Sequence, residues 1–345
     1  MRFFHNDYNE ICHQKVLDKL NALSGAQVGG YGVDPYCEGA SQLIRDLCEN
    51  EDCAVHFLVG GTQTNLTVIA ASLRPYQGVI SADSGHINVH ETGAIEATGH
   101  KVLAVASTDG KLTAGQVAEL TEAQNNSMDA EHIVQPKMVY ISQSTEYGTV
   151  YTRRELEELR AVCDRYHLYL FVDGARLGYG LAAEDCDVTL ADLARLADVF
   201  YIGGTKMGAM FGEAVVISNP QLNVDFRYMI KQRGAMLAKG WLIGAQFQAL
   251  MSEGLYFEIG RHANAMAQRI RDTLEKVNCP VLVKNKTNQV FPILSNDVLK
   301  NIGKNFTYSV IETVDESRTA VRFCTSWATK EEDVLALCEE IEKNI

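Results

Sequence analysis

Two segments of the chain bring a charged side chain and glycines to the end of a short apolar run. In the first, the run from Leu168 to Val172 is followed directly by Asp173. In the second, the run from Val199 to Ile202 is followed by two glycines, a threonine and Lys206. Each run is typical of a buried strand, and ligands of open α/β sheets bind at the carboxyl ends of the strands. We therefore expect both charged groups at one edge of a sheet.

A carboxylate and an amine at that edge suit pyridoxal phosphate (PLP), whose aldehyde forms a Schiff base with a lysine and whose pyridine nitrogen needs an acidic partner. The residues around Lys206 are small or apolar, so its amine would lose hydration and its pKa would fall, which makes the amine a nucleophile. Taken alone, Lys206 would more simply be a solvated loop lysine, and Asp173 with Arg176 a surface ion pair.

A glycine-rich turn, Gly60-Gly61-Thr62-Gln63-Thr64-Asn65, lies between a predicted strand and a predicted helix. Its backbone N–H groups and threonine hydroxyls could hold a phosphate. For this segment alone, a turn with a capping threonine is the favoured interpretation. Neither the dinucleotide-binding nor the P-loop glycine pattern is complete, which argues against a nicotinamide-dependent dehydrogenase.

Two histidines follow another predicted strand end. The ring of His86 could stack on a flat cofactor, or His86 could be an ordinary polar turn residue. His90 lies four positions later, a spacing used by metal ligands on helices, but the H-E-x-x-H pattern is absent. We therefore expect no metal site.

Several basic side chains are further candidates. Arg176 offers a planar fork for a phosphate or a carboxylate. Arg322 lies between two apolar residues of a predicted strand, so it faces either solvent or a cleft. Lys231, Arg233 and Lys239 form a basic run whose usual meaning is a solvated face.

The elements that must position these residues alternate along most of the chain. Apolar runs predict strands at 55–59, 78–80, 101–106, 138–142, 168–172, 199–202 and 214–217, and periodic stretches predict helices at 14–23, 62–73, 113–124, 153–166 and 190–196. Alternation with short connections indicates an α/β fold with a mostly parallel central sheet and helices on both faces.

The pattern changes after Gln221. Helices are predicted at 225–251, 254–276 and 330–345, with short strands at 281–283, 289–294, 306–311 and 320–323. We expect three parts: an N-terminal segment, 1–13, near the small domain or the active site; a large domain, 14–245; and a small C-terminal α+β domain, 246–345.

The composition narrows the class of protein. The chain has 345 residues, 46% of them hydrophobic, and a formal net charge of −13. The acidic balance argues against nucleic acid or an anionic membrane as a partner, and no apolar run is long enough to span a membrane. The nine cysteines include no C-x-x-C pair and the N-terminus is polar, so we expect a cytoplasmic protein with reduced thiols and no signal peptide.

The order of these motifs resembles the fold-type I PLP enzymes, and more closely the low-specificity L-threonine aldolases of the β-eliminating lyase group. The resemblance covers nearly the whole chain. It is carried by the Gly-Gly-Thr turn, by His86 with the following Glu91-Thr92-Gly93-Ala94, by Asp173-Gly-Ala-Arg176, and by Lys206. The lysine element, Gly-Gly-Thr-Lys-Met-Gly, departs from the family's more usual Ser-Lys-Gly form.

The resemblance implies a role for each matching residue. Lys206 would form the Schiff base with PLP, Asp173 would bond the pyridine nitrogen, and His86 would stack on the ring. Gly61, Thr62 and Gln63 would hold the phosphate. Arg176 and Arg322 would bind the substrate carboxylate. Lys231 would reach the cofactor phosphate of a neighbouring subunit, which implies a homodimer or homotetramer with shared active sites.

The implied reaction is cleavage of L-threonine or L-allo-threonine to glycine and an aldehyde such as acetaldehyde. Glu146 stands where the family has a histidine near the substrate's β-hydroxyl, so Glu146, His86 or a bound water is the candidate base. The family's arginine after Lys231 has only Lys239 as a nearby counterpart. Two other functions stay open: β-elimination from a serine- or cysteine-like amino acid on the same scaffold, and a non-catalytic ligand-binding protein.

Overall fold

A computed structural model describes all 345 residues of the chain. The centre of the large domain is a seven-stranded sheet, made of β2 (Ala54–Leu58), β3 (Gln77–Ala82), β4 (Lys101–Val105), β5 (Gln135–Ser142), β6 (Tyr169–Asp173), β7 (Val199–Gly203) and β8 (Glu213–Ile217). The spatial order is β2-β8-β7-β6-β5-β3-β4. Strands β4, β3, β5, β6 and β7 are parallel, whereas β8 runs antiparallel to both of its neighbours. The sheet is therefore mostly parallel, as predicted.

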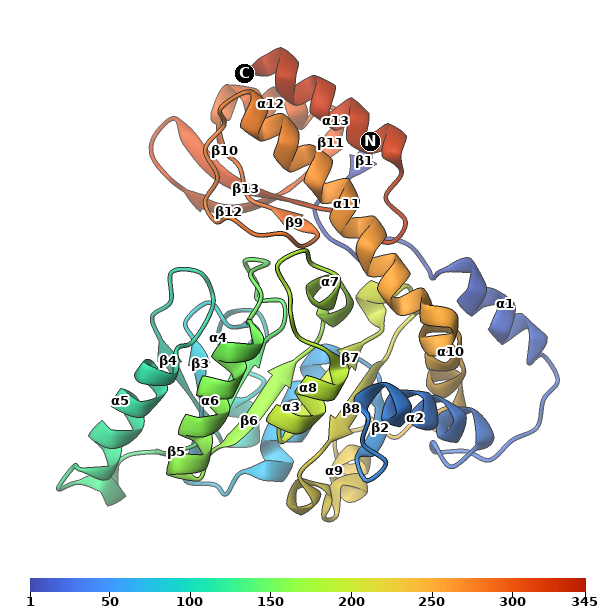
Figure 1. Cartoon of the computed structure of the whole chain (residues 1–345), viewed down its shortest axis with the longest axis vertical. Helices are drawn as coiled ribbons and strands as arrows, with labels where there is room; N and C mark the ends of the chain where they lie inside the picture. Colours follow the sequence, from blue (N-terminus) through green and yellow to red (C-terminus); the bar gives the residue numbers. More distant parts are fainter.

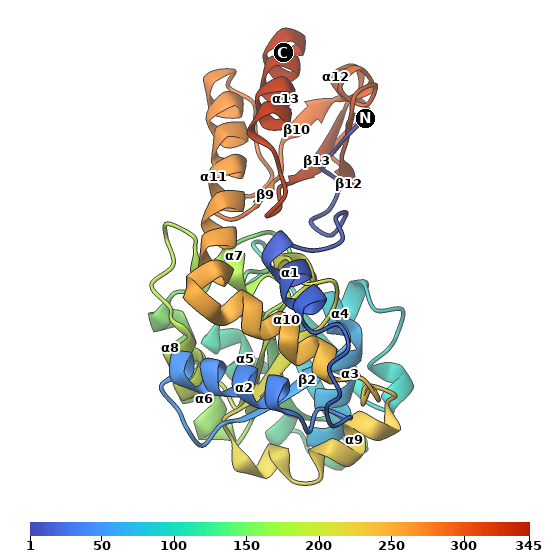
Figure 2. The ribbon, with the colours of Figure 1, turned by 90° about the vertical axis from the view of Figure 1, so that its right-hand side faces the viewer.

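Helices cover both faces of this sheet (Figures 1 and 2). One face carries α1 (Gln14–Ala22), α2 (Pro35–Cys48), α5 (Ala114–Asn125), α6 (Arg153–Tyr166), α7 (Leu177–Leu181), α8 (Leu190–Leu196) and α10 (Trp241–Met251), and the other carries α3 (Gly61–Ser72), α4 (His86–Val89) and α9 (Phe226–Gln232). Strand alternation explains the two cores. On β5, Val139 and Ile141 belong to the first core, whereas Met138 and Tyr140 belong to the second.

The C-terminal part forms a small α+β layer above the large domain in Figure 1. It contains α11 (Leu255–Lys276), β9 (Gln289–Val290), β10 (Ile293–Ser295), α12 (Asn296–Ile302), β11 (Phe306–Thr307), β12 (Ser309–Thr313), β13 (Arg318–Cys324) and α13 (Glu331–Asn344). Helix α11 connects the layers, because Leu255 to Ala263 pack in the large-domain core while Met266 to Leu274 pack in a third core. The predicted domain boundary at residue 246 falls inside α10.

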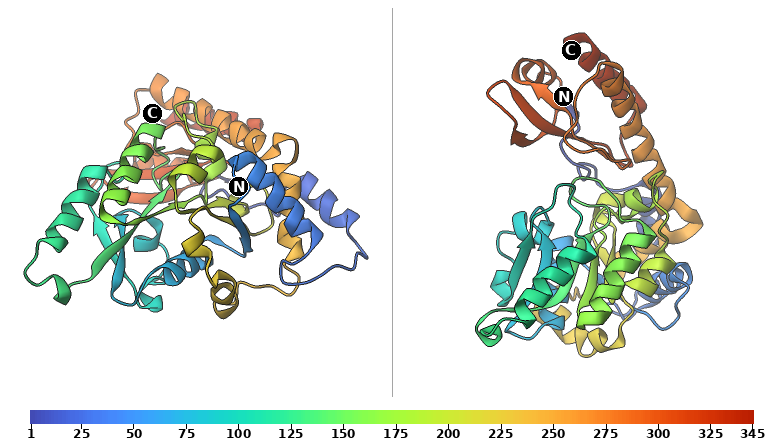
Figure 3. Two further views of the ribbon diagram at one scale, coloured as in Figure 1. Left: turned by 60° about the horizontal axis from the view of Figure 1, so that its bottom comes forward. Right: turned by 60° about the vertical axis from the view of Figure 1, so that its left-hand side comes forward.

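The N-terminal segment crosses between the layers. Strand β1 (Arg2–Phe3) pairs in parallel with β11 of the small domain, and Phe4 is buried in the third core. The chain then descends to α1 on the large domain, as Figure 3 also shows. Residues 5–12 thus pass between the two domains.

The single long helix predicted for 225–251 is wrong. The structure instead has α9 and α10, separated by a turn over residues 233–240. Gly234 adopts a left-handed backbone with a φ of 72°, which ends α9 and which other residues adopt at a cost. The strand predicted at 281–283 is reduced to one bridge, between Val281 and Pro292.

None of the helices combines the length and the apolar character that crossing a membrane requires. All nine cysteines are free thiols.

Candidate active site

The predicted site residues converge at the carboxyl ends of the parallel strands. His86 opens α4 just after β3, Glu146 follows β5, Asp173 ends β6, and Lys206 lies in a short 3-10 turn after β7. A cavity of about 350 Å³ touches all four residues. It adjoins a second cavity of about 790 Å³ between the domains, which shares His86, Glu146 and Lys206 with it.

Asp173 is held by hydrogen bonds on both of its carboxylate oxygens. The Tyr140 hydroxyl donates to Oδ2 and the Tyr201 hydroxyl to Oδ1, each at 2.5 Å, and the Ala175 backbone N–H donates to Oδ1 at 2.9 Å. Burial alone would raise the pKa of Asp173, but His86 and these donors outweigh it, so the pKa lies below its usual value. A fixed anion suits a partner for a protonated ring nitrogen.

A buried network connects this carboxylate to His86. Asn65 Nδ2 donates to Asp173 Oδ2 at 3.0 Å and to Glu91 Oε1 at 2.8 Å, and His86 Nδ1 lies 2.7 Å from the same oxygen of Glu91. The Glu91 side chain is completely buried. The ring of His86 is thereby oriented from the side away from the cavity.

The turn that carries Lys206 rests on a second buried carboxyl group. Glu213, on β8, accepts hydrogen bonds from the Gly204 backbone N–H and from the Thr205 hydroxyl, both at 3.0 Å. Burial raises the pKa of Glu213. Burial and the nearby Arg176 lower the pKa of Lys206, as the sequence predicted, which favours the neutral nucleophilic amine.

The first turn of α3 provides free donors at the opposite wall. Gly60 precedes the helix without any side-chain cap, so the N–H groups of Gly61 and Thr62 keep no partner within the chain. Gly60, Gly61, Thr62 and Thr205 all line the 350 Å³ cavity. An uncapped helix start attracts an anion. With Lys206 and Asp173 in the same cavity, the donor set fits the phosphate, the aldehyde and the ring nitrogen of PLP.

Arg176 forms a buried ion pair that the sequence did not predict. Its Nε and Nη2 donate to Asp7 at 2.7 and 3.0 Å, and Asn288 Nδ2 donates to the same carboxylate at 2.9 Å. Asp7 is 0% exposed. Burial alone would raise the pKa of Asp7, but Arg176 holds it well below its usual range. Only Nη1 of Arg176 remains without a partner in the protein.

Arg322 enters the 790 Å³ cavity from β13 of the small domain. Its Nη1 donates to Gln289 Oε1 at 3.1 Å and its Nη2 to the His5 carbonyl at 3.0 Å. Its Nε is buried without a hydrogen-bond partner. Because the guanidinium group lines the cavity and is cationic, this position favours an anionic ligand.

Glu146 occupies the boundary between the two cavities. Its Oε1 accepts from the His86 backbone N–H at 2.9 Å and from the Ser142 hydroxyl at 2.8 Å. Burial, and next to it the charge of Asp173, raise the pKa of this carboxyl. A carboxylate with a raised pKa is a stronger base than an ordinary glutamate.

Two predicted residues do not line either cavity of their own chain. The Gln63 side chain turns away and bonds the Val59 N–H and the Arg233 carbonyl. Lys231 lies over the ring of Tyr31, with Nζ 4.9 Å from its centroid. Lys239 is also absent from the lining of both cavities.

Other functional groups escaped the sequence reasoning. Asn65 and Glu91 lie inside segments that the motifs include, but nothing in the pattern separates them from their neighbours. The two tyrosines on Asp173 occupy ordinary strand positions. Asp7 had no signal, because its partner lies 169 residues away.

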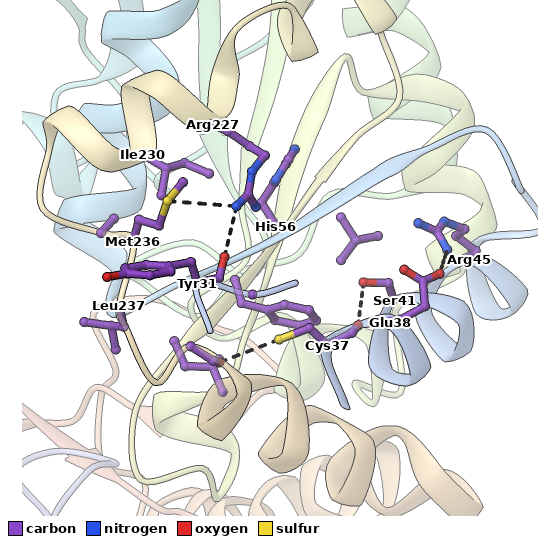
Figure 4. A pocket seen from close by; sticks show the side chains of 16 residues that line it. Tyr31, Cys37, Glu38, Ser41, Arg45, His56, Arg227, Ile230, Met236 and Leu237 are labelled. Carbon is purple, nitrogen blue, oxygen red and sulfur yellow. Dashed lines mark hydrogen bonds and ion pairs between the residues drawn. The ribbon is translucent and has the colours of Figure 1, made fainter. Parts of the chain in front are cut away.

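A smaller cavity of about 100 Å³ lies away from this site, between α2, β2 and α9 (Figure 4). Its polar side chains mostly bond within the protein: Cys37 to the Gly240 carbonyl, Arg45 to Glu38, and Arg227 to the Tyr31 carbonyl. It shares no residue with the two cavities around Lys206. No group of three or more His, Cys, Asp or Glu side chains in the structure could hold a metal ion.

Comparison with known proteins identifies the family. Residues 15–297 match the beta-eliminating lyase family. A low specificity L-threonine aldolase of Pseudomonas sp. is 31% identical over 99% of this chain and 96% of its own length, and one of Pseudomonas aeruginosa is 30% identical with the same coverage. The structure of a threonine aldolase of Leishmania major is 45% identical, covers 99% of both chains and superposes with a TM-score of 0.97.

A more distant structure shows the fold alone. An aspartate aminotransferase of Thermus thermophilus covers 99% of this chain and 91% of its own, with a TM-score of 0.73 and 14% identity. The predicted fold-type I architecture and the resemblance to the low-specificity L-threonine aldolases are confirmed. The chain belongs to the beta-eliminating lyase family.

Proposed function

We propose that this protein is a PLP-dependent lyase that cleaves L-threonine and L-allo-threonine between Cα and Cβ, giving glycine and acetaldehyde. The observation that carries the proposal is the shared cavity of Lys206, Asp173, His86 and Glu146, which opens onto Arg322. The relatives named as threonine aldolases, which match the chain over nearly its whole length, support the same reaction.

Different residues of the cavity would bind different groups of PLP. Lys206 would bind its aldehyde, and the free N–H groups of Gly61 and Thr62 would bind its phosphate. Asp173 would keep the ring nitrogen protonated, and His86 would lie against the ring. When bound, PLP supplies an electron sink for the electron pair of a bond broken at Cα.

Arg322 is the proposed receptor for the substrate carboxylate, because its cationic side chain lines the same cavity as Lys206. Arg176 contributes through Nη1 and through its charge, since Asp7 occupies its other face. Holding the carboxylate in a fixed place orients the bond between Cα and Cβ for cleavage.

Glu146 is the proposed base for the β-hydroxyl. Its carboxylate takes the hydroxyl proton as the bond between Cα and Cβ breaks, and the β-carbon leaves as an aldehyde. Replacement of Glu146 by Gln keeps an acceptor for the His86 N–H but removes the base. We expect kcat/KM for L-threonine to fall about 100-fold and to lose its rise with pH. An unchanged pH profile would assign the proton to His86 or to water.

The test of the function is aldehyde release from L-threonine and L-allo-threonine by purified, PLP-loaded protein. The Lys206→Ala variant should release none and should lack the visible absorbance of lysine-bound PLP. Lys300→Ala, which removes an exposed lysine of the small domain outside both cavities, is the matched control and should behave as the wild type. Pyruvate release from serine or cysteine with no aldehyde from threonine would instead favour β-elimination.

The active sites would be shared within a homodimer or homotetramer. The loop and helix around Lys231 expose apolar side chains: Tyr31, Val33, Val224 and Tyr228 are 48%, 69%, 71% and 77% exposed. Exposed apolar patches of this kind mark protein interfaces, and Lys231 would reach the partner's cofactor from here. Light scattering should give at least a dimer for the wild type and a smaller species for Val224→Asp. The free thiols support a cytoplasmic location.

A further inference from the structure

The larger cavity continues far beyond the reacting groups. It has a volume of about 790 Å³ and is open to solvent, and Asp83, which is exposed, lines it with Ser84 and Ser107. Asp83 follows β3 and Ser107 follows β4, so the strand order β7-β6-β5-β3-β4 places them at the end of the cavity away from Lys206, which follows β7. The side chain of threonine adds only a methyl group to its β-carbon, so threonine leaves this far end, which we call the distal chamber, empty of substrate. The distal chamber is therefore available to longer substituents on the β-carbon.

The charges of the cavity are separated along its length. Arg176 follows β6 and Lys206 follows β7, on the side of the sheet away from β3 and β4, and with Arg322 they mark the end where the substrate carboxylate would bind. Asp83 lies in the distal chamber, where it accepts one hydrogen bond, from the Ser107 backbone N–H at 3.2 Å, and pairs with no basic side chain.

The raised pKa of Tyr147 indicates a negative electrostatic potential in the distal chamber. Burial raises the pKa of its hydroxyl, and the charges of Glu312, Asp83 and Glu146 raise it further. His90 also lines the cavity, and its pKa is lowered by burial and by its basic neighbours, so it adds little positive charge. A cation beside Tyr147 would feel the same three charges, and two of them, Asp83 and Glu146, line the cavity.

The walls between the two ends are apolar. Val89 on α4 of the large domain and Val310 on β12 of the small domain both line the cavity and are 49% and 64% exposed. The rings of Tyr147 and Phe291 meet edge to face, with centroids 6.0 Å apart. Such walls suit a chain of methylene groups, and aromatic faces also attract a cation.

We propose that the distal chamber receives β-hydroxy-α-amino acids whose side chain continues through several methylene groups and ends in an ammonium group, and that Asp83 selects this charge. The proposal rests on the proposed aldol cleavage, since it names a substrate class for the same site. Asp83 acts on specificity and takes no part in breaking the bond.

Three substrates of equal chain length test this proposal: 3-hydroxylysine, 3-hydroxynorleucine and 3-hydroxy-2-aminoadipate. Glycine release is measured for each, and each kcat/KM is divided by the value of the same protein for L-threonine. We expect the cationic substrate to exceed the neutral one by about three- to fivefold, as for a partly exposed charge pair, and the anionic one to be poorest. Added salt should shrink the difference.

Asp83→Asn keeps an acceptor for the Ser107 N–H and removes the charge, so the preference for the cation should disappear. Asp129→Asn, which removes an exposed carboxylate on a remote loop, should keep it. Calorimetric binding of L-lysine and L-norleucine to the PLP-loaded proteins gives a second readout, with the same order and the same loss in Asp83→Asn.

The outcomes separate the two proposals. Cleavage of L-threonine without a preference for the cation, or a preference that survives in Asp83→Asn, overturns the assignment of the chamber and leaves the aldolase function standing. Failure to cleave L-threonine overturns the proposed function, and the substrate class falls with it.

Discussion

The floor of the site, formed by the strand ends of the large domain, and its roof, formed by residues 5–8 and the small domain, hold their charged groups differently. On the floor, Asp173 is bound by hydroxyl and amide groups of neighbouring elements and has no cation within salt-bridge distance. On the roof, Asp7 and Arg176 form an ion pair that joins the N-terminal segment to the large domain.

The difference indicates that the floor serves ligand binding and the roof holds the two domains together. The groups of the floor lie at or just after the ends of strands of one sheet, and its buried anion remains available to a ligand. The roof connects the two domains through the N-terminal segment. Strand β1 pairs with β11, the His5 carbonyl accepts from the Arg322 guanidinium, and Asp7 binds Arg176. We expect changes in the floor to reduce activity with the fold intact, and changes in the roof to reduce stability.

The largest effect should come from breaking the roof. Asp7→Ala leaves Arg176 buried without its counter-ion, so we expect the free energy of unfolding to fall by about 3–5 kcal/mol. Denaturation with urea measures the change. Glu10→Ala, an exposed change in the same segment, should stay within about 0.5 kcal/mol of the wild type. A loss below 1 kcal/mol for Asp7→Ala would show that the pair is no structural tie.

Acid should remove the same contribution. The pKa of Asp7 is lowered in the folded protein, so its stabilising contribution is present above the pKa of the unfolded chain, about 3.9, and is lost as the pH falls toward the folded value. The difference in unfolding free energy between the wild type and Asp7→Asn should be constant from pH 7 to about pH 5 and shrink below about pH 4. A difference that grows on acidification would contradict the assignment.

Breaking the floor should affect the reaction instead. Asp173→Asn keeps the size of the side chain but removes the anion that would face the ring nitrogen. We expect kcat for L-threonine to fall about 100-fold, the size of effect seen when one preorganised electrostatic group is lost, with a far-ultraviolet circular dichroism spectrum like that of the wild type. If this variant unfolded, or kept full activity, the expectation that changes in the floor reduce activity without affecting the fold would be wrong.

The floor was largely predictable from the sequence, and the reason is local. Asp173 and Lys206 each follow an apolar run, and parallel strands bring their carboxyl ends to one edge. The same logic located His86, whereas Glu146 was identified only through the family resemblance. The role of Gln63 as a phosphate ligand stays a prediction, and its side chain turns away from the cavity to bond the Val59 N–H and the Arg233 carbonyl.

The roof was not predictable in the same way. Asp7 meets Asn288 across 281 positions, and β1 pairs with a strand more than 300 positions away. A short polar segment has no periodic pattern, so its sequence does not predict contacts with residues so far along the chain. The prediction of one helix across 225–251 was wrong for a related reason. A single glycine with a positive φ, Gly234, ends α9, although the residues around it favour a helix.

The smallest effect is expected at Glu91, which holds the ring of His86 in place on the floor. Glu91 lines neither cavity around Lys206, yet its Oε1 accepts from Asn65 and lies 2.7 Å from His86 Nδ1. Glu91→Gln keeps an oxygen for both contacts and removes the charge that strengthens them, so the ring of His86 should become less firmly oriented. We expect about a tenfold loss in kcat, equal to about 1.4 kcal/mol, a typical gain from a charged partner in a hydrogen bond.

The distinguishing readout is the visible circular dichroism of bound PLP, which depends on how the ring is held. The signal should weaken in Glu91→Gln while the urea midpoint changes little, because the buried contacts remain. Glu96→Gln, which neutralises an exposed carboxylate in the next turn of the same segment, is the matched control. If Glu91→Gln instead lowered the urea midpoint as much as Asp7→Ala, the floor would also be a structural tie, and its charges would serve the fold before they serve the cofactor.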